Sequence, residues 1–213
     1  MSLVFVDLDG TLLVKTSAER LFFRYLVRRK VLGIRQGSAF LTFTFQWIDT
    51  YGKHVWKKNK AYLAHLKVCE IESLAAHFVH ETLMQYLCPT MRQRLEMHHR
   101  NGDETVLLTG TLDCIAKPLI LLLEMPHCCA TVCETVKGRF SHVPPIIHPY
   151  GQEKLRIGRD LCRKLGYHLS ECTAYANSIH DRSLLEAVAR PVVVHPDRRL
   201  RRIADSCSWE IIA

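Results

Sequence analysis

The stretch FVDLDGTLL, residues 5–13, places two carboxylates, Asp7 and Asp9, directly after a short apolar run. Residues 3–8 are rich in Leu, Val and Phe, which predicts a buried strand. Gly10 follows at once, so the acidic pair falls where that strand should end and the chain should turn. Two like charges this close repel each other unless something positive lies between or beside them. The stretch therefore predicts a strand whose end holds a cation.

The composition is typical of a globular protein. Of the 213 residues, 48% are hydrophobic and 23% are charged, which predicts a soluble chain with one sizeable domain or a domain with an insertion. No apolar run approaches the roughly 20 residues that a membrane span requires. The first residues have no basic segment, and Asp7 interrupts their apolar run, so no signal peptide is expected. The nine cysteines lack a spacing typical of disulfides, which favours reduced thiols and a cytoplasmic location.

Positive charge is concentrated in one part of the chain. The formal net charge is +8, and residues 15–60 hold 11 Lys and Arg against two acidic residues, a net +9. The simpler interpretation of this aromatic-rich segment is a helical bundle with solvated basic side chains. The alternative is a peripheral contact with an anionic membrane, with residues 40–48 (FLTFTFQWI) lining a pocket for lipid tails. Either surface would attract an anionic substrate. We expect no nucleic-acid binding, because no known binding motif accompanies the charge.

The order of the predicted elements indicates an α/β protein with a helical insertion. Thr16 and Glu19 match a capping box that opens a helix, and helical patterns continue through most of the first hundred residues. Strands then alternate with helices, which predicts a parallel sheet with helices on both faces. The first strand belongs to that sheet, so we expect a core of residues 1–14 and 101–213 and a helical unit of residues 15–100.

Apolar periodicity sets the expected elements within this outline. It predicts helices at about 17–30, 37–50, 53–66, 71–87, 113–125, 151–165, 181–189 and 197–205. It predicts strands at 104–108, 130–133, 172–176, 191–194 and 209–212, and a hairpin over 135–141. In an open parallel sheet ligands bind at the carboxyl ends of the strands, so the residues that follow each strand are the candidates for function.

Polar residues follow three of the predicted strands, and a lysine lies in the first turn of the helix before the third. These candidate site residues are Asp7, Asp9, Thr109, Gly110, Lys154, Asn177 and Asp181. Because the carboxyl ends of parallel strands share one edge of the sheet, we expect these residues to converge. The four histidines His98, His99, His142 and His148 have no ligand-like partners at a set spacing, and are expected in the core or on the surface.

The candidate residues are of the types that phosphoryl transfer requires. Closely spaced oxygen ligands favour Mg²⁺, which leaves room for a substrate phosphate. Asp7 would attack phosphorus and form an aspartyl-phosphate. Asp9 would protonate the leaving oxygen and later take a proton from water. Thr109 and the amides after it would bind phosphate oxygens, and Lys154 would stabilise the developing negative charge. Gly10 would leave space for the phosphate.

Taken together, these motifs resemble those of the haloacid dehalogenase-like superfamily of phosphohydrolases. DLDGT is similar to the family's first motif, LLTGT to its second, Lys154 to its third and ANSIHD to its fourth, in the family's order. The helical insertion after the first strand is similar to the cap of the phosphoserine phosphatase branch. The resemblance implies a Rossmann-like core with an all-helical cap and a Mg²⁺-dependent phosphatase. It also implies that Asp7, the backbone carbonyl of Asp9 and Asn177 hold Mg²⁺, with Asp181 supporting the metal's waters.

Two residues depart from the family's pattern. The fourth motif usually begins with Asp, whereas this chain has Asn177, whose amide oxygen carries no negative charge, so we expect weaker Mg²⁺ binding. In phosphoserine phosphatases a Glu soon after the first motif holds the substrate amine. Glu19 is the nearest candidate, but the expected capping box would occupy it, so phosphoserine is not the predicted substrate.

Several alternatives stay open at this level. Thr109 or Asp181 could cap a helix instead of serving the site. The predicted substrate is a small phosphorylated metabolite or a phospholipid-type headgroup, and the phosphoryl group could pass to an alcohol instead of water. The alternative function is a non-catalytic protein that binds a phosphometabolite or a membrane on a hydrolase scaffold, with a metal site weakened at Asn177.

Overall fold

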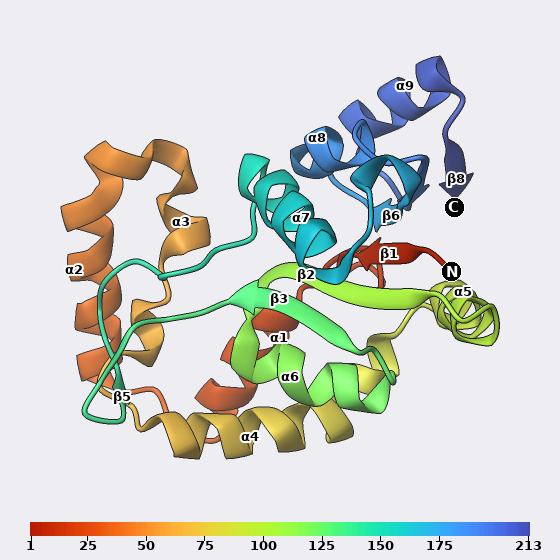
Figure 1. Cartoon of the computed structure of the whole chain (residues 1–213). Coiled ribbons are helices and arrows are strands. Elements are labelled where there is room, and N and C mark those ends of the chain that lie inside the picture. Colours follow the sequence, from red (N-terminus) through yellow and green to blue (C-terminus); the bar gives the residue numbers. More distant parts are fainter.

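Six parallel strands form one sheet in the computed structural model, which describes residues 1–213 (Figure 1). Their order is β3-β2-β1-β6-β7-β8, and every neighbouring pair is parallel. The strands are β1 (Leu3–Val6), β2 (Glu104–Leu112), β3 (His127–Thr131), β6 (Thr173–Ala176), β7 (Arg190–Val194) and β8 (Glu210–Ile212). A separate antiparallel hairpin pairs β4 (Thr135–Val136) with β5 (Arg139–Phe140). The prediction of an α/β fold with a parallel sheet is confirmed.

Strand β1 is central because its short apolar sequence is buried on both faces. Val4 and Val6 belong to the larger hydrophobic cluster on one face, and Leu3 and Phe5 belong to the smaller cluster on the other. This burial on both faces explains the continuous run of apolar residues, since an alternating pattern would place polar side chains in one of the clusters.

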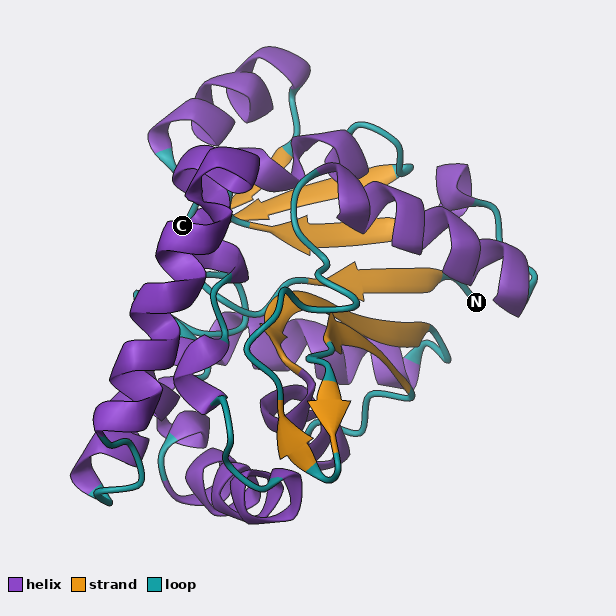
Figure 2. Cartoon of the chain, turned by 90° about the vertical axis from the view of Figure 1, so that its left-hand side faces the viewer, coloured by secondary structure: helices purple, strands orange, loops and turns teal.

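Helices cover both faces of the sheet, as Figure 2 shows. On one face lie α1 (Ala18–Arg28), α4 (Val68–Glu81), α5 (Pro89–Arg100) and α6 (Asp113–Leu122), whose apolar residues share the larger cluster. On the other lie α7 (Gln152–Leu165), α8 (Arg182–Leu185) and α9 (Arg198–Cys207), which contribute to the smaller one. The carboxyl ends of β1, β2 and β6 face a cavity, which residues of the helical insertion also line.

Helices α2 (Ile34–Tyr51) and α3 (Val55–Lys58) project to one side, opposite the two chain termini (Figure 1). They pack around a small cluster of their own, made by Phe43, Val55 and Ala61. By contrast, α1, α4 and α5 share the hydrophobic cluster of the sheet. The division into a core of residues 1–14 and 101–213 and a cap of residues 15–100 stays a prediction.

Two of the expected helices are much shorter than predicted. The segment 53–66 contains only α3 and two 3₁₀ turns, Gly52–His54 and Ala61–Leu63. Asn59 ends α3 in an extended conformation, and its side chain donates to the carbonyl of Phe40 and accepts from the amide of Ala61. These side-chain bonds replace helical ones, as is typical of Asn. The helix expected at 181–189 is reduced to α8. None of the helices combines the length and apolar character that crossing a bilayer would require.

Candidate active site

The loop after β1 turns tightly and brings its carboxylates to the edge of the sheet. The amide of Asp7 donates to the carbonyl of Tyr175 at 3.0 Å, which ties the end of β1 to β6. Gly10 has φ of +82°, a conformation that side-chain-bearing residues rarely adopt. A Cβ at Gly10 would lie 2.0 Å from the Nδ2 atom of Asn177. The backbone conformation of Gly10 therefore favours glycine, and a side chain there would also displace the amide of Asn177.

A buried lysine compensates the charge of the first carboxylate. Lys154 lies in the first turn of α7, and its Nζ is 2.6 Å from Oδ1 of Asp7 and 2.8 Å from Oδ1 of Asp181. All three side chains are buried. Burial opposes the positive charge of Lys154, but Asp181 and Asp7 outweigh this effect and raise its pKa. Burial raises the pKa of Asp7, and the nearby ammonium acts in the opposite direction. Asp181 bonds no helix amide with its side chain, so the interpretation as a side-chain cap is not supported.

Asp9 meets a different environment. Its Oδ1 accepts a hydrogen bond from the amide of Ala18 at 2.8 Å, and its Oδ2 accepts one from the hydroxyl of Ser17 at 2.9 Å. Its carboxylate thus caps α1 from outside the helix, at the positive end of the helix dipole. Burial nevertheless raises the pKa of Asp9 to about 6, and the charge of Asp7 adds to this increase. An acid with this pKa can both donate and accept a proton near neutral pH.

The second motif belongs to a strand and not to a helix end. Strand β2 continues to Leu112, and Oγ1 of Thr109 accepts a hydrogen bond from the amide of Thr111 at 3.1 Å. Thr109 therefore does not cap α6, which begins at Asp113.

One cavity of about 590 Å³ brings the predicted residues together. All seven candidates line it: Asp7, Asp9, Thr109, Gly110, Lys154, Asn177 and Asp181. They come from positions as far apart in sequence as 7 and 181, which supports the convergence expected at the carboxyl edge of the sheet. Their individual roles stay predictions.

The oxygen donors in this cavity fit Mg²⁺. Asp7 and Asp181 offer carboxylates and Asn177 offers an amide, the ligand types that a hard divalent cation prefers. The carboxylate of Asp9 is engaged by Ser17 and Ala18, which leaves its backbone carbonyl as the expected ligand. No group of three or more His, Cys, Asp or Glu side chains is placed to hold a metal, so an Mg²⁺ site here depends on Asn177 and backbone oxygen.

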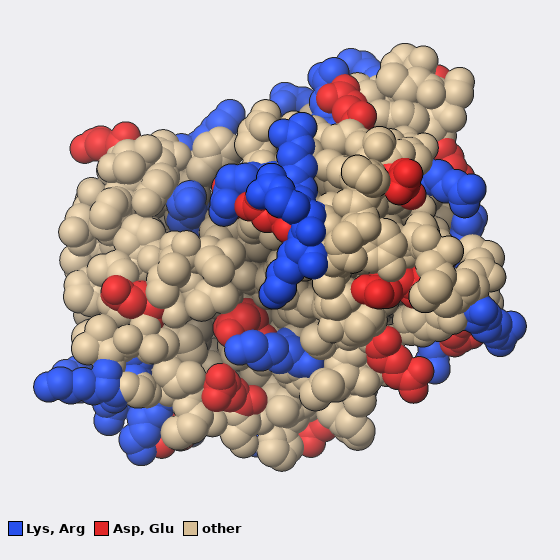
Figure 3. All heavy atoms as spheres, viewed as in Figure 1, with Lys and Arg blue, Asp and Glu red and all other residues tan.

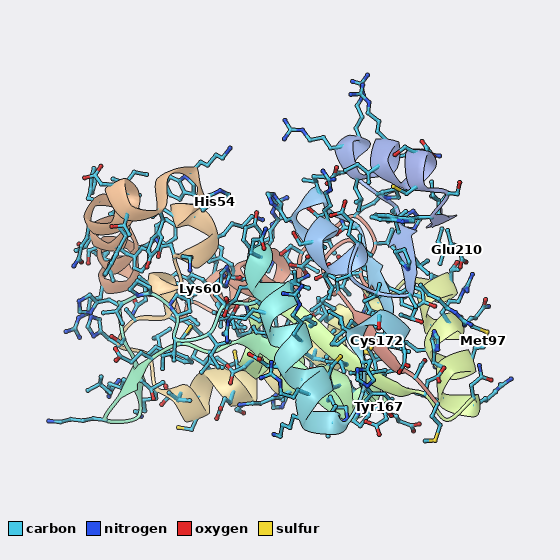
Figure 4. The ribbon with its side chains drawn as sticks, turned by 45° about the horizontal axis from the view of Figure 1, so that its top comes forward. His54, Lys60, Met97, Tyr167, Cys172 and Glu210 are labelled. Carbon is cyan, nitrogen blue, oxygen red and sulfur yellow. The ribbon has the colours of Figure 1, made fainter.

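The predicted capping box is wrong, and it concealed a contact within the cavity. Helix α1 begins after Ser17, and Glu19 instead accepts a short hydrogen bond from Lys60 and one from the hydroxyl of Tyr62 at 3.1 Å. Asp9 replaces the expected cap because it reaches the free amide of Ala18. Figure 4 shows Lys60 on the side of the insertion that faces the sheet and α7. No local pattern marks Lys60, which is one of several lysines between residues 53 and 60.

Comparisons with known proteins agree with this arrangement. The sequence pattern of the haloacid dehalogenase-like hydrolases matches residues 4–186. Phosphoserine phosphatase SerB1 of Mycobacterium tuberculosis (strain ATCC 25618 / H37Rv) is 30% identical over 221 residues, which cover 97% of this chain and 69% of that protein. A protein of unknown function from Bordetella pertussis Tohama I has a similar structure, with a TM-score of 0.82 and 23% identity over 99% of this chain and 97% of that one. A substrate-bound phosphoserine phosphatase is similar in fold, with a TM-score of 0.66 and 12% identity over 99% of this chain and 92% of its own.

The family match spans most of the chain, and the order of its motifs agrees with the site. The chain belongs to the haloacid dehalogenase-like hydrolases. Within that family it is a phosphatase that resembles the phosphoserine phosphatase branch in sequence and fold.

Proposed function

We propose that the chain is a Mg²⁺-dependent phosphomonoesterase that acts through an aspartyl-phosphate on Asp7. The single observation that carries this proposal is the buried ion pair of Asp7 with Lys154, 2.6 Å apart and open to a cavity that also holds Asp9. A buried carboxylate with a fixed cation and a nearby acid of matched pKa suits nucleophilic catalysis with general acid help. The substrate is a small phosphorylated metabolite or a phospholipid-type headgroup.

The residues divide the reaction into two steps. An oxygen of Asp7 forms a bond to phosphorus while the ester oxygen leaves, and Asp9 gives its proton to that oxygen. A water molecule then attacks the same phosphorus, gives its proton to Asp9, and releases Asp7 and inorganic phosphate. Lys154 holds Asp7 in place through Oδ1, so Oδ2, which only Thr11 approaches, at 3.3 Å, is the oxygen available for attack. Mg²⁺, when bound by Asp7, Asn177 and the Asp9 carbonyl, would neutralise charge on the transferring phosphoryl group.

The contact of Glu19 argues against an amine-bearing substrate such as phosphoserine. Lys60 and Tyr62 already occupy Glu19, so a substrate ammonium would have to displace an internal one. We therefore still expect that phosphoserine is not the substrate, but the reason is the contact of Glu19 with Lys60 and Tyr62 and not a capping box. That SerB1 is named a phosphoserine phosphatase makes phosphoserine the necessary comparison in any substrate screen.

Substitution of the nucleophile tests the proposal. Hydrolysis of p-nitrophenyl phosphate would be measured with Mg²⁺, with EDTA, and in the variant Asp7→Asn. We expect Asp7→Asn to lower kcat by about 10³-fold or more, because no covalent intermediate forms. The control Asp205→Asn changes an exposed carboxylate without a hydrogen bond and should keep wild-type activity.

The same samples separate the proposal from its alternatives. Trapping the phosphorylated protein by acid quench and locating the phosphate on Asp7 by mass spectrometry would support the intermediate. Glycerol added as an acceptor would reveal transfer to an alcohol by the appearance of glycerol phosphate. A well-folded wild type with no hydrolysis of any phosphate ester, indistinguishable from Asp7→Asn, would favour the non-catalytic binding protein.

A further inference from the structure

One buried atom in the cavity has no hydrogen-bond partner, and the proposed chemistry does not use it. His148 lines the cavity and is buried, and its Nε2 bonds to nothing. Leaving a buried polar atom unpaired is costly, so such an atom in a cavity calls for a ligand that satisfies it. Three buried side-chain atoms in the molecule lack a partner, and only His148 among their residues lines this cavity.

The neighbours of His148 determine which of its nitrogens carries hydrogen. The hydroxyl of Thr131 donates to the carbonyl of Gly110 at 2.6 Å and also lies 2.9 Å from Nδ1 of His148. A carbonyl only accepts and a hydroxyl has a single hydrogen, so Nδ1 must be the donor to Thr131. Burial and the charges of the nearby lysines, first Lys60, lower the pKa of His148 to about 3. The neutral ring therefore presents a bare lone pair at Nε2.

The ring of His148 lies beside Gly110, one of the expected phosphate-binding residues. A Cβ on Gly110 would lie 3.7 Å from Cε1 of His148, the ring atom between the two nitrogens. Nε2 is bonded to this same Cε1, and Nδ1 alone is engaged by Thr131. Phosphate oxygens only accept hydrogen bonds when the phosphate is fully ionised, so they do not match this acceptor. A hydrogen-bond donor on the alcohol part of the substrate does match the acceptor Nε2.

We propose that His148 is a specificity-determining residue whose Nε2 accepts a hydrogen bond from a hydroxyl group beside the phosphate ester. The substrate class is then a phosphate monoester of a polyol, with a free hydroxyl on the carbon next to the phosphorylated one. This inference rests on the proposed function for the position of the phosphate. An ammonium group is a poorer match than a hydroxyl, because the positive charges of Lys57, Lys58 and Lys60 act on the same place.

A pair of substrates that differ by one hydroxyl tests this inference. Propane-1,2-diol 1-phosphate and n-propyl phosphate would be compared by kcat/KM. We expect the wild type to prefer the diol ester about fivefold or more, the usual effect of one hydrogen bond. In His148→Asn the amide can keep the bond to Thr131 but lacks the second acceptor. The two esters should then have about equal kcat/KM values. In His148→Gln the longer side chain can place an oxygen near the position of Nε2 and should restore part of the preference.

A binding measurement keeps the inference independent of catalysis. The non-hydrolysable isosteres 3-hydroxybutyl phosphonate and n-butyl phosphonate would be titrated into wild type and variants by calorimetry. A hydroxyl preference that His148→Asn abolishes supports the inference, even if no phosphate ester is hydrolysed and the proposed function fails. An active wild type that treats both compounds of each pair alike overturns the inference and leaves the proposed function standing.

Two controls complete the experiment. His142 is exposed and lies, like His148, in the segment between β5 and α7. The variant His142→Asn should therefore keep the wild-type preference for the diol ester. Inhibition by inorganic phosphate reports on the phosphate position alone. If His148→Asn weakened the binding of inorganic phosphate as much as the binding of the diol ester, His148 would hold the phosphate itself. The inference would then be wrong.

Discussion

Asp7 and Asp9 are two residues apart, yet their surroundings suit them for different tasks. Asp7 is buried against the Lys154 ammonium, which favours its ionised form. Asp9 has no cationic partner and accepts hydrogen bonds only from Ser17, Ala18 and Thr111. A carboxylate held by a fixed ammonium is suited to act as a nucleophile, and a carboxyl with a pKa of about 6 is suited to act as an acid.

The raised pKa of Asp9 predicts a pH dependence that varies with the leaving group. Asp9 has a pKa of about 6 and keeps its proton up to about that pH, whereas an ordinary Asp has a pKa of 3.8. We expect kcat/KM for an alkyl phosphate, which needs the proton, to fall relative to that for p-nitrophenyl phosphate as the pH rises above about 6. Each kcat/KM is calculated for the dianion of its substrate, because the two phosphate esters lose their second proton at different pH values. Asp9→Asn should make the ratio independent of pH, and a ratio that already shows no pH dependence in the wild type would contradict Asp9 as the acid.

Asn177 predicts a metal site of reduced charge. We expect Asn177→Asp to lower the Mg²⁺ concentration for half-maximal activity by about tenfold, because a carboxylate adds a negative charge to the ligand set. Activity titrated with MgCl₂ measures this change. The control Asn101→Asp makes the same substitution at an exposed helix end. An Mg²⁺ requirement that does not respond to Asn177→Asp would show that this side chain is not a ligand.

At the level of elements, helix α5 is attached to the sheet by a buried polar network. Nδ1 of His98 lies 2.8 Å from Oδ2 of Asp103, and its Nε2 lies 2.9 Å from the hydroxyl of Tyr175 on β6. Asp103 also accepts bonds from the amide and hydroxyl of Ser2. The network thus joins α5 to residues flanking or within three strands, on the side of the molecule away from the cavity, where Figure 4 labels Met97 and Glu210.

Removal of the central histidine should destabilise the fold without changing the site. We expect His98→Leu to lower the free energy of unfolding by about 1–3 kcal/mol, because it removes the hydrogen-bond partner of the Tyr175 hydroxyl and of Oδ2 of Asp103. Urea unfolding followed by circular dichroism measures the loss. His80→Leu, an exposed substitution on α4, is the control and should change stability by less than about 0.5 kcal/mol. Asp103 keeps its bonds from Ser2 in this variant, so the loss arises from its Oδ2 and from the hydroxyl of Tyr175. If Tyr175→Phe and His98→Leu had strictly additive effects, these two side chains would not be coupled.

At the level of the whole molecule, apolar side chains are exposed along the outer surface of α2. Ile34, Leu41, Phe45 and Ile48 are 93%, 57%, 78% and 37% exposed, and their spacing places them on one face of the helix. In Figure 3 the surface over α2 is mostly uncharged on the face shown, with Lys and Arg elsewhere. This apolar stripe belongs to the basic segment of residues 15–60, and an exposed apolar face combined with basic residues is typical of interfacial helices.

This arrangement predicts binding to anionic bilayers. We expect the chain to sediment with vesicles rich in phosphatidylglycerol and not with phosphatidylcholine vesicles, and the bound fraction to fall as salt is added. The double variant Leu41→Ser and Phe45→Ser should reduce binding severalfold, whereas Thr42→Ser, on the same helix, should not. Sedimentation with neither kind of vesicle would contradict a membrane contact, and equal sedimentation with both would contradict its preference for anionic lipid.

The site was predictable from sequence because each of its parts ends or begins a regular element. Asp7 and Asn177 follow apolar runs that form strands, Thr109 follows the apolar part of β2, and Lys154 lies in the first turn of an amphipathic helix. The segment 53–66 was not predictable, because its conformation depends on hydrogen bonds between Asn59 and the distant Phe40. His148 gives no local signal either, since its hydrogen-bond partner Thr131 is 17 residues away.

The sequence by itself determined the parallel sheet, the order of the motifs and the set of residues at the carboxyl edge, because periodicity and chain order are local properties. Only the tertiary structure decided that Glu19 is neutralised by Lys60, that Asp181 bonds Lys154 and not a helix amide, and that His148 presents an unpaired Nε2. These three outcomes depend on which polar atoms meet when distant segments pack, and burial makes each such partnership energetically decisive.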